Sequence, residues 1–176
     1  MGSKYYETPN IDKLSKSGIT FLNGYASSAN CAPSRATMMS GKYHPSHGIY
    51  TVSPSERGLD LTRKIIPIKN TENLSLDFFT IAEMLKSKGY VNAHVGKWHL
   101  GEKGHYPKDQ GFDVNIGGWE SGGPRGGYFS PYSNPNLENG PDGEYLTDRL
   151  TKEAINFIDD NKDCLLYTSP SPRDLP

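Results

Sequence analysis

The pattern over residues 80–95, which predicts a helix that leads directly into a strand, constrains the fold of this chain more than any other feature. Thr80 and Glu83 have the spacing of a capping box at a helix start, and Gly89 marks the helix end. Residues 90–95 then alternate as expected of a strand. A helix that precedes a strand in this way is typical of an open α/β sheet, in which ligands gather beyond the carboxyl ends of the strands. The predicted fold class is therefore α/β.

The loop after this strand, residues 96–101, carries an ammonium and an imidazole. In an extended segment, side chains two residues apart point to the same side, so Lys97 and His99 can enter one pocket while Trp98 packs the other way. Fixed positive groups of this kind stabilise an anion whose charge is spread over several oxygens. The alternative is a solvated lysine and a half-buried histidine that only end the strand.

A second segment, residues 31–41, predicts a short helix with reactive side chains at its start. Pro33 suits the first helical turn, and Gly41 suits the left-handed position just past the end. Cys31 then lies beside unpaired backbone N–H groups and the positive end of the helix dipole, which favour an anion. Arg35 is one turn further on, so its guanidinium can return to the same end and bind an oxyanion. The alternative is a buried, inert cysteine.

Together these two segments resemble the two signatures of the type I, formylglycine-dependent sulfatases. Residues 31–35 are Cys-Ala-Pro-Ser-Arg, which resembles the family's Cys-x-Pro-Ser-Arg. Gly89 and Tyr90, followed by Gly-Lys-Trp-His-Leu-Gly at residues 96–101, resemble the second signature. The resemblance covers about residues 4–163. It implies an alkaline-phosphatase-like sulfatase fold, a mixed sheet flanked by helices, which is incomplete here and lacks its first strand.

The resemblance also implies a role for each of four side chains. A maturation enzyme would oxidise Cys31 to formylglycine, an aldehyde that holds water as a geminal diol, and this residue would be both the nucleophile and a ligand of Ca²⁺. One hydroxyl would attack sulfur, and the second would later lose its proton and expel sulfate. Arg35 would stabilise the hydrate and its charge. Lys97 would bind a sulfate oxygen, and His99 would hydrogen-bond the formylglycine hydroxyl and assist proton transfer, so both would also bind substrate.

The resemblance implies hydrolysis of a sulfate monoester. The substrate would be a sulfated small molecule or, as is usual in the family, a sulfated glycan. Two alternatives stay open: a phosphonate or phosphodiester hydrolase of the same superfamily, and an inactive fragment that at most binds a sulfated glycan. The family's aspartate pair, its downstream Asp-Asn pair and its His-Lys set are not found, so the remaining metal ligands are expected from outside this chain, and this segment alone is expected to be inactive. A parent protein in the periplasm, outside the cell or in the lysosome is expected.

Charge and apolar content argue against two other classes of function. The chain has 19 Lys and Arg residues against 20 Asp and Glu residues, a net charge of −1. Nonspecific nucleic-acid binding, which needs a basic excess, is therefore not expected. No apolar run approaches the roughly 18 residues of a membrane span, so none is predicted. The two cysteines do not define a disulfide framework.

Other elements are predicted from caps and periodicity. They are a helix over residues 8–18, a short strand over 19–22, a long loop at the rim of the site over 117–139, and an amphipathic helix over 144–161 that should lie against the sheet. His44 and His47, on either side of Pro45, are expected in a loop with solvated imidazoles.

The chain is expected to divide after Asp163. Residues 1–163 are predicted to be a partial sulfatase catalytic domain. Residues 165–167 are expected to be the stub of a buried strand, which the alternating prolines of residues 168–176 should not continue. Residues 164–176 are therefore expected to be a disordered tail, or a translated cloning artefact rather than native sequence.

Overall fold

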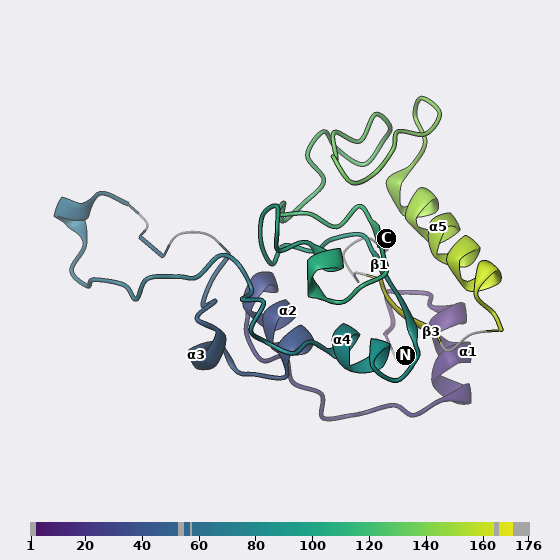
Figure 1. Cartoon of the computed structure of the whole chain (residues 1–176), viewed down its shortest axis with the longest axis horizontal. Helices are drawn as coiled ribbons and strands as arrows, with labels where there is room; N and C mark the ends of the chain where they lie inside the picture. The colour runs from purple at the N-terminus through teal and green to yellow at the C-terminus, as the bar shows by residue number, and fades with distance from the viewer. Residues whose placement is uncertain (1–2, 53–54, 57, 164–165, 171–176) are drawn as a thin grey trace.

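Three parallel strands form the sheet around which the described part of the chain is arranged (Figure 1). A computed structural model describes residues 3–52, 55–56, 58–163 and, for the backbone alone, 166–170. In chain order the elements are α1 (Pro9–Ser17), α2 (Cys31–Ser40), α3 (His44–His47), the 3₁₀ turn η1 (Asp60–Thr62), α4 (Ile81–Lys86), β1 (Val91–Val95), the 3₁₀ turn η2 (Pro107–Gln110), β2 (Val114–Ile116), α5 (Leu146–Asp160) and β3 (Leu166–Pro170). None of these helices is long and apolar enough to cross a membrane.

β1 is the central strand, in the order β2–β1–β3. It pairs in parallel with both neighbours, and Val95 lies opposite Ile116 on one side and Pro170 on the other. Parallel neighbours need a crossover connection, which α5 provides between β2 and β3. The predicted α/β fold is confirmed. Among the described residues, the antiparallel part of the expected mixed sheet is a single bridge between Phe129 and Tyr145.

The two faces of β1 pack against different hydrophobic clusters, because successive side chains of a strand point to opposite faces. On one face the His94 ring contacts Trp98 and Phe112, which belong to a cluster that includes residues of α2 and α4. On the other face Val95 packs in a cluster with Leu150 of α5. Figure 1 shows α5 on one side of β1 and both α2 and α4 on the other. The predicted packing of the long amphipathic helix on the sheet is therefore confirmed.

The helix before β1 begins with the predicted capping box. The Thr80 hydroxyl accepts the Glu83 N–H at 3.2 Å, and the Glu83 carboxylate accepts the Thr80 N–H at 2.7 Å. The Thr80 hydroxyl also donates to the Gln110 carbonyl at 2.7 Å, so the cap is tied to η2 as well. The helix itself ends earlier than predicted, at Lys86, and Gly89 follows in the left-handed region at φ +84°.

The helix predicted over residues 8–18 is present as α1, but the strand predicted over residues 19–22 is wrong. Ile19, Phe21 and Leu22 are 83%, 81% and 90% exposed, and the segment has no strand partner among the described residues. A strand requires a neighbour that satisfies its backbone N–H and C=O groups, which β-branched composition alone cannot supply.

The loop predicted around His44 and His47 is also wrong, because these residues form the single turn α3. His47 is buried, and its Nδ1 accepts the Ile49 N–H at 3.1 Å. Nε2 therefore carries the proton of a neutral ring and contacts Thr37 Oγ1 at 3.2 Å. Burial lowers the pKa of His47, with a smaller contribution from the nearby His44. His47 is thus a neutral anchor between α2 and α3 rather than a solvated side chain.

The strand predicted to stop at residue 167 continues through Pro170 as β3. β3 lies at the edge of the sheet and Pro170 is its last residue, a position where a missing N–H is tolerated. The rest of the predicted tail, residues 164–165 and 171–176, lies outside the described residues. The division of the chain after Asp163 therefore stays a prediction.

Candidate active site

Helix α2 begins at Cys31, as predicted. Ala32, Ala36 and Met39 bury one face of this helix in the core, and Gly41 ends it in the left-handed region at φ +67°. The Cys31 thiol is half-buried. The first N–H groups of a helix have no partner within it, so a negative charge on the side chain of Cys31 is stabilised at this position.

The loop after β1 is not the extended segment that was expected. His99 has φ +60°, in the left-handed region that side chains rarely adopt, so the predicted alternation along an extended chain is wrong here. Two hydrogen bonds hold the loop in this form. Nε1 of the fully buried Trp98 donates to the His105 carbonyl at 2.8 Å, and the His99 N–H donates to the Trp119 carbonyl at 3.0 Å.

The structure brings the two predicted segments together. Cys31 Sγ lies 3.4 Å from Nδ1 of His99, although 68 residues separate them. Nη1 of Arg35 donates to the Lys97 carbonyl at 2.6 Å, across 62 residues. This second bond was not predicted, and it ties α2 to the backbone of the loop. The Lys97 side chain is buried at 7% exposure.

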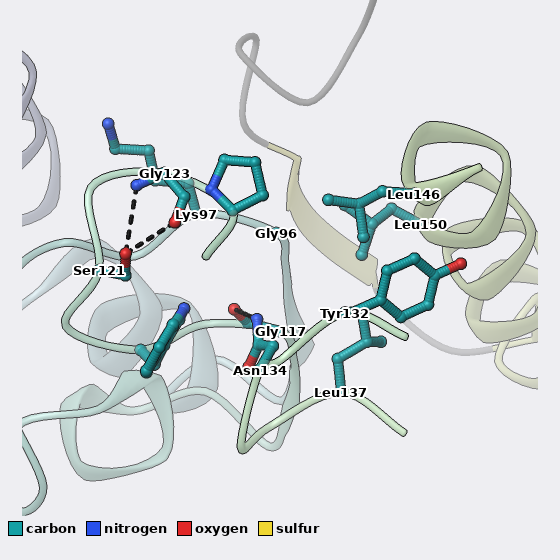
Figure 2. A pocket seen from close by; sticks show the side chains of 12 residues that line it. Gly96, Lys97, Gly117, Ser121, Gly123, Tyr132, Asn134, Leu137, Leu146 and Leu150 are labelled. Atoms are coloured by element: carbon teal, nitrogen blue, oxygen red, sulfur yellow. Dashed lines mark hydrogen bonds between the residues drawn. The ribbon is translucent and has the colours of Figure 1, made fainter. Parts of the chain in front are cut away.

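Lys97 and His99 line two different pockets, which share Ser121. Figure 2 shows the pocket beside Lys97, whose polar end also contains Ser121 and Gly123, and there the Ser121 hydroxyl donates to the Gly123 carbonyl at 2.7 Å. The apolar end of the pocket is formed by Tyr132, Leu137, Leu146 and Leu150. The loop predicted at the rim of the site, residues 117–139, therefore supplies much of this lining.

The pocket beside His99 is lined mainly by polar side chains, and it reaches Ala32 at the start of α2. The Arg125 guanidinium lies 5.1 Å from the centre of the Trp119 ring. Tyr106 donates to the carboxylate of Glu120 at 2.6 Å, and this hydrogen bond raises the pKa of Tyr106 to about 12. The charged residues of the lining are Glu72, Glu102, Glu120 and Arg125. Such groups can hydrogen-bond a hydroxylated molecule next to Cys31.

Gly122 lies directly against the His99 ring. A Cβ at this position would be 2.7 Å from Cε1 and 2.9 Å from Nε2 of His99, closer than real Cβ atoms approach other atoms. At the next residue, Gly123, a Cβ would have no neighbour within 4 Å. Only glycine at residue 122 therefore allows the rim loop to approach His99 this closely, and the sequence prediction assigned no role to this glycine.

His94 is a second residue that the sequence prediction missed. It is 1% exposed on the central strand. Burial and, to a smaller extent, the nearby charge of Arg35 lower the pKa of His94 to about 3, although a hydrogen bond with the Lys97 backbone acts in the opposite direction. The available signal was an imidazole three residues before Lys97, inside a strand that was predicted correctly.

The predicted Ca²⁺ has no complete site in the part of the chain that the structure describes. No group of three or more His, Cys, Asp or Glu side chains there could hold a metal ion. Calcium takes about six to eight oxygen ligands, of which a formylglycine at residue 31 would supply only a small part. The described residues alone do not fit this ion, and the role of Cys31 as a metal ligand stays a prediction.

Comparison with known proteins adds independent information. The family model named Sulfatase matches residues 1–171. N-acetylgalactosamine-6-sulfatase from Mus musculus is 33% identical over an alignment of 180 residues. The alignment covers 89% of this chain and 32% of that protein. The crystal structure of Ps i-CgsB in complex with k-i-k-neocarrahexaose matches 99% of this chain and 42% of its own, with a TM-score of 0.76 and 30% identity.

A second solved structure is BT4656 in complex with its substrate D-glucosamine-2-N,6-O-disulfate. It matches 95% of this chain and 29% of its own, with a TM-score of 0.64 and 25% identity. The chain thus spans about a third of the length of the mouse relative and less than half of either solved chain.

Proposed function

Because the chain belongs to the sulfatase family, we propose that it carries the nucleophile and the substrate-binding side chains of a hydrolase that cleaves a sulfate monoester. The 3.4 Å contact between Cys31 Sγ and His99 Nδ1 is the observation that carries this proposal. A residue that can become a nucleophile then has a proton-transfer group within reach, as covalent catalysis requires.

Oxidation of Cys31 to formylglycine by a maturation enzyme is part of the proposal. The surroundings support it, because the half-buried thiol is at a helix N-terminus and contacts His99, which lines an adjoining polar pocket. Formylglycine supplies a hydrated aldehyde, in which one hydroxyl can attack sulfur and the other allows sulfate to be released. Nδ1 of His99 would hold or accept the proton of the group at residue 31.

Lys97 would provide the positive charge that binds the sulfate group, and Arg35 would stabilise the formylglycine hydrate and its charge. The Lys97 side chain is buried, and a charge acts more strongly on an oxyanion where water is excluded. Arg35 is bonded to the Lys97 carbonyl, so the cation on α2 and the cation on the loop are held as one unit. Preorganised charge of this kind lowers the barrier because it does not have to reorient during the reaction.

A sulfated glycan is the substrate class that we propose. The support is indirect: one solved relative is bound to a neocarrahexaose and another to a disulfated glucosamine. The polar lining of the pocket beside His99 suits the hydroxyl groups of a sugar. A sulfated small molecule is the alternative within the same reaction. Homology to sulfatases also supports a parent protein in the periplasm, outside the cell or in the lysosome.

The full gene product, co-expressed with a formylglycine-generating enzyme, tests this proposal. Mass spectrometry of the Cys31 peptide should show the aldehyde, and 4-nitrophenyl sulfate should be hydrolysed in preference to 4-nitrophenyl phosphate. Cys31→Ala is the matched control and should abolish turnover. A preference for phosphate or phosphonate esters would support the phosphohydrolase alternative. A converted Cys31 peptide without any turnover would support a protein that binds glycans without cleaving them.

A further inference from the structure

We propose that His94 is a positioning residue of this site: together with Arg35 it holds the Lys97 carbonyl, and so it sets where Lys97 and His99 lie relative to Cys31. The inference rests on the proposed function, and it concerns a residue in the spacer of the second signature, to which the resemblance assigns no role. It is carried by the confinement of the His94 ring and by the two hydrogen bonds that meet at one carbonyl.

The His94 ring is confined on several sides. It lies edge-to-face against Trp98, with ring centres 5.2 Å apart at 88°, and against Phe112, at 5.4 Å and 79°. Gly118 lies close to Nδ1, and a Cβ there would be 2.8 Å from that atom. At 1% exposure the ring also has no access to solvent. The imidazole therefore has one orientation, which is what a positioning group needs.

The Lys97 carbonyl is the point where β1 and α2 are joined to the loop. His94 forms a hydrogen bond with the Lys97 backbone, and Nδ1 has no partner among the described residues, so the bond is made through Nε2. This bond raises the pKa of His94, the direction expected when a ring N–H donates to a carbonyl. Arg35 donates to the same carbonyl at 2.6 Å. Two donors on two elements thus fix one peptide plane at the start of the loop.

The positive charge of Arg35 favours an uncharged His94 imidazole. Arg35 is the charged group that acts on His94, and together with burial it keeps the pKa of His94 at about 3. A neutral ring can donate one hydrogen bond without placing a second positive charge beside the guanidinium. In this proposal His94 acts through the Lys97 carbonyl and through the loop that carries His99.

Two variants of similar side-chain length separate positioning from packing. His94→Gln keeps a donor that can reach the Lys97 carbonyl, whereas His94→Met keeps only the volume. In the matured full gene product with 4-nitrophenyl sulfate, His94→Met should lower kcat by about ten-fold or more with a smaller change in KM, and His94→Gln should stay within about three-fold of wild type. Phe112→Leu trims the same ring cluster but leaves both donors to the Lys97 carbonyl, so it should lower kcat clearly less than His94→Met does.

Alkylation of Cys31 by iodoacetamide in the unmatured chain gives a readout that needs no sulfatase activity. The pH profile of the rate should be the same for wild type and His94→Gln and should shift in His94→Met, because His99 would move relative to Sγ. Identical kcat and identical profiles for the Met and Gln variants would overturn the inference, as would equal losses in His94→Met and Phe112→Leu. If wild type hydrolyses no sulfate ester, the proposed function fails while the alkylation comparison still decides on His94.

A measurement on the unmodified sequence covers the case in which a His94 variant does not fold. Nitrogen chemical shifts of the His94 ring in wild-type protein should show a neutral imidazole protonated at Nε2 between about pH 5 and pH 8. A charged ring in that range, or a ring protonated at Nδ1 alone, would contradict the proposed bond to Lys97.

Discussion

Replacing Gly122 with alanine should move the His99 ring away from Cys31. The new Cβ would lie 2.7 Å from Cε1 of His99. Carbon atoms in contact need about 3.5 Å, so the ring must shift by about 0.8 Å. Gly122 does not have a left-handed backbone, so alanine brings no strain of its own. The substitution therefore acts through this one contact.

The shift is large compared with the contact that it disturbs. Cys31 Sγ and His99 Nδ1 are 3.4 Å apart, and a displacement approaching 1 Å takes them out of contact or changes their angle. Misplacement of about 1 Å in an active site costs roughly 100-fold in rate, which corresponds to about 2.7 kcal/mol of activation free energy. Overpacking should also lower the free energy of unfolding, by about 1 kcal/mol.

The assay is hydrolysis of 4-nitrophenyl sulfate by the matured full gene product, with the formylglycine content of each variant measured in parallel. Gly123→Ala is the matched control, because its Cβ would have no neighbour within 4 Å, and it should retain wild-type kcat. Wild-type kcat in Gly122→Ala at equal formylglycine content would refute the argument that the approach of Gly122 fixes His99. Equal losses in both alanine variants would refute it as well.

Three further predictions concern stability and charge. Thr80→Val removes the cap acceptor and the hydroxyl that donates to Gln110, so urea unfolding should show a loss of about 1–2 kcal/mol. The folded-state pKa of His94, about 3, lies below its ordinary value, so its contribution to stability is complete above pH 6.5 and falls as the pH drops towards 3. Between pH 7 and pH 5 this amounts to about 2 kcal/mol, which His94→Gln should remove from the pH dependence of urea unfolding. Arg35→Gln removes a cation and its bond to the Lys97 carbonyl, so kcat/KM for the sulfate ester should fall by about 100-fold or more.

Local signals in the sequence were sufficient to predict the helix and the strand that precede the site. The capping box at Thr80 and the alternation before Gly96 are encoded within a few residues, and both are present in the structure. β2 was missed because three residues, Val114–Ile116, are too few to establish a period of two. The strand predicted over residues 19–22 was wrong for a different reason. Their composition suits a strand, but a strand forms only where a neighbouring strand pairs with it.

The meeting of Cys31 and His99 was predicted from the family resemblance and not from local pattern. A contact across 68 residues depends on the whole topology, which periodicity does not specify. The left-handed backbone of His99 and the close approach of Gly122 were not visible in the sequence for the same reason. Each is defined by atoms from another segment of the chain.

The bond from Arg35 ends on a main-chain oxygen, which every amino acid at position 97 would offer equally. Exchange of the lysine can therefore remove the charge that we propose binds the sulfate ester and leave the cross-link between helix and loop intact. Exchange of the arginine removes its own charge and this cross-link together. A mutant library screened for soluble protein should consequently accept many residues at 97 and few at 35, whereas the same library screened for turnover should be restricted at both.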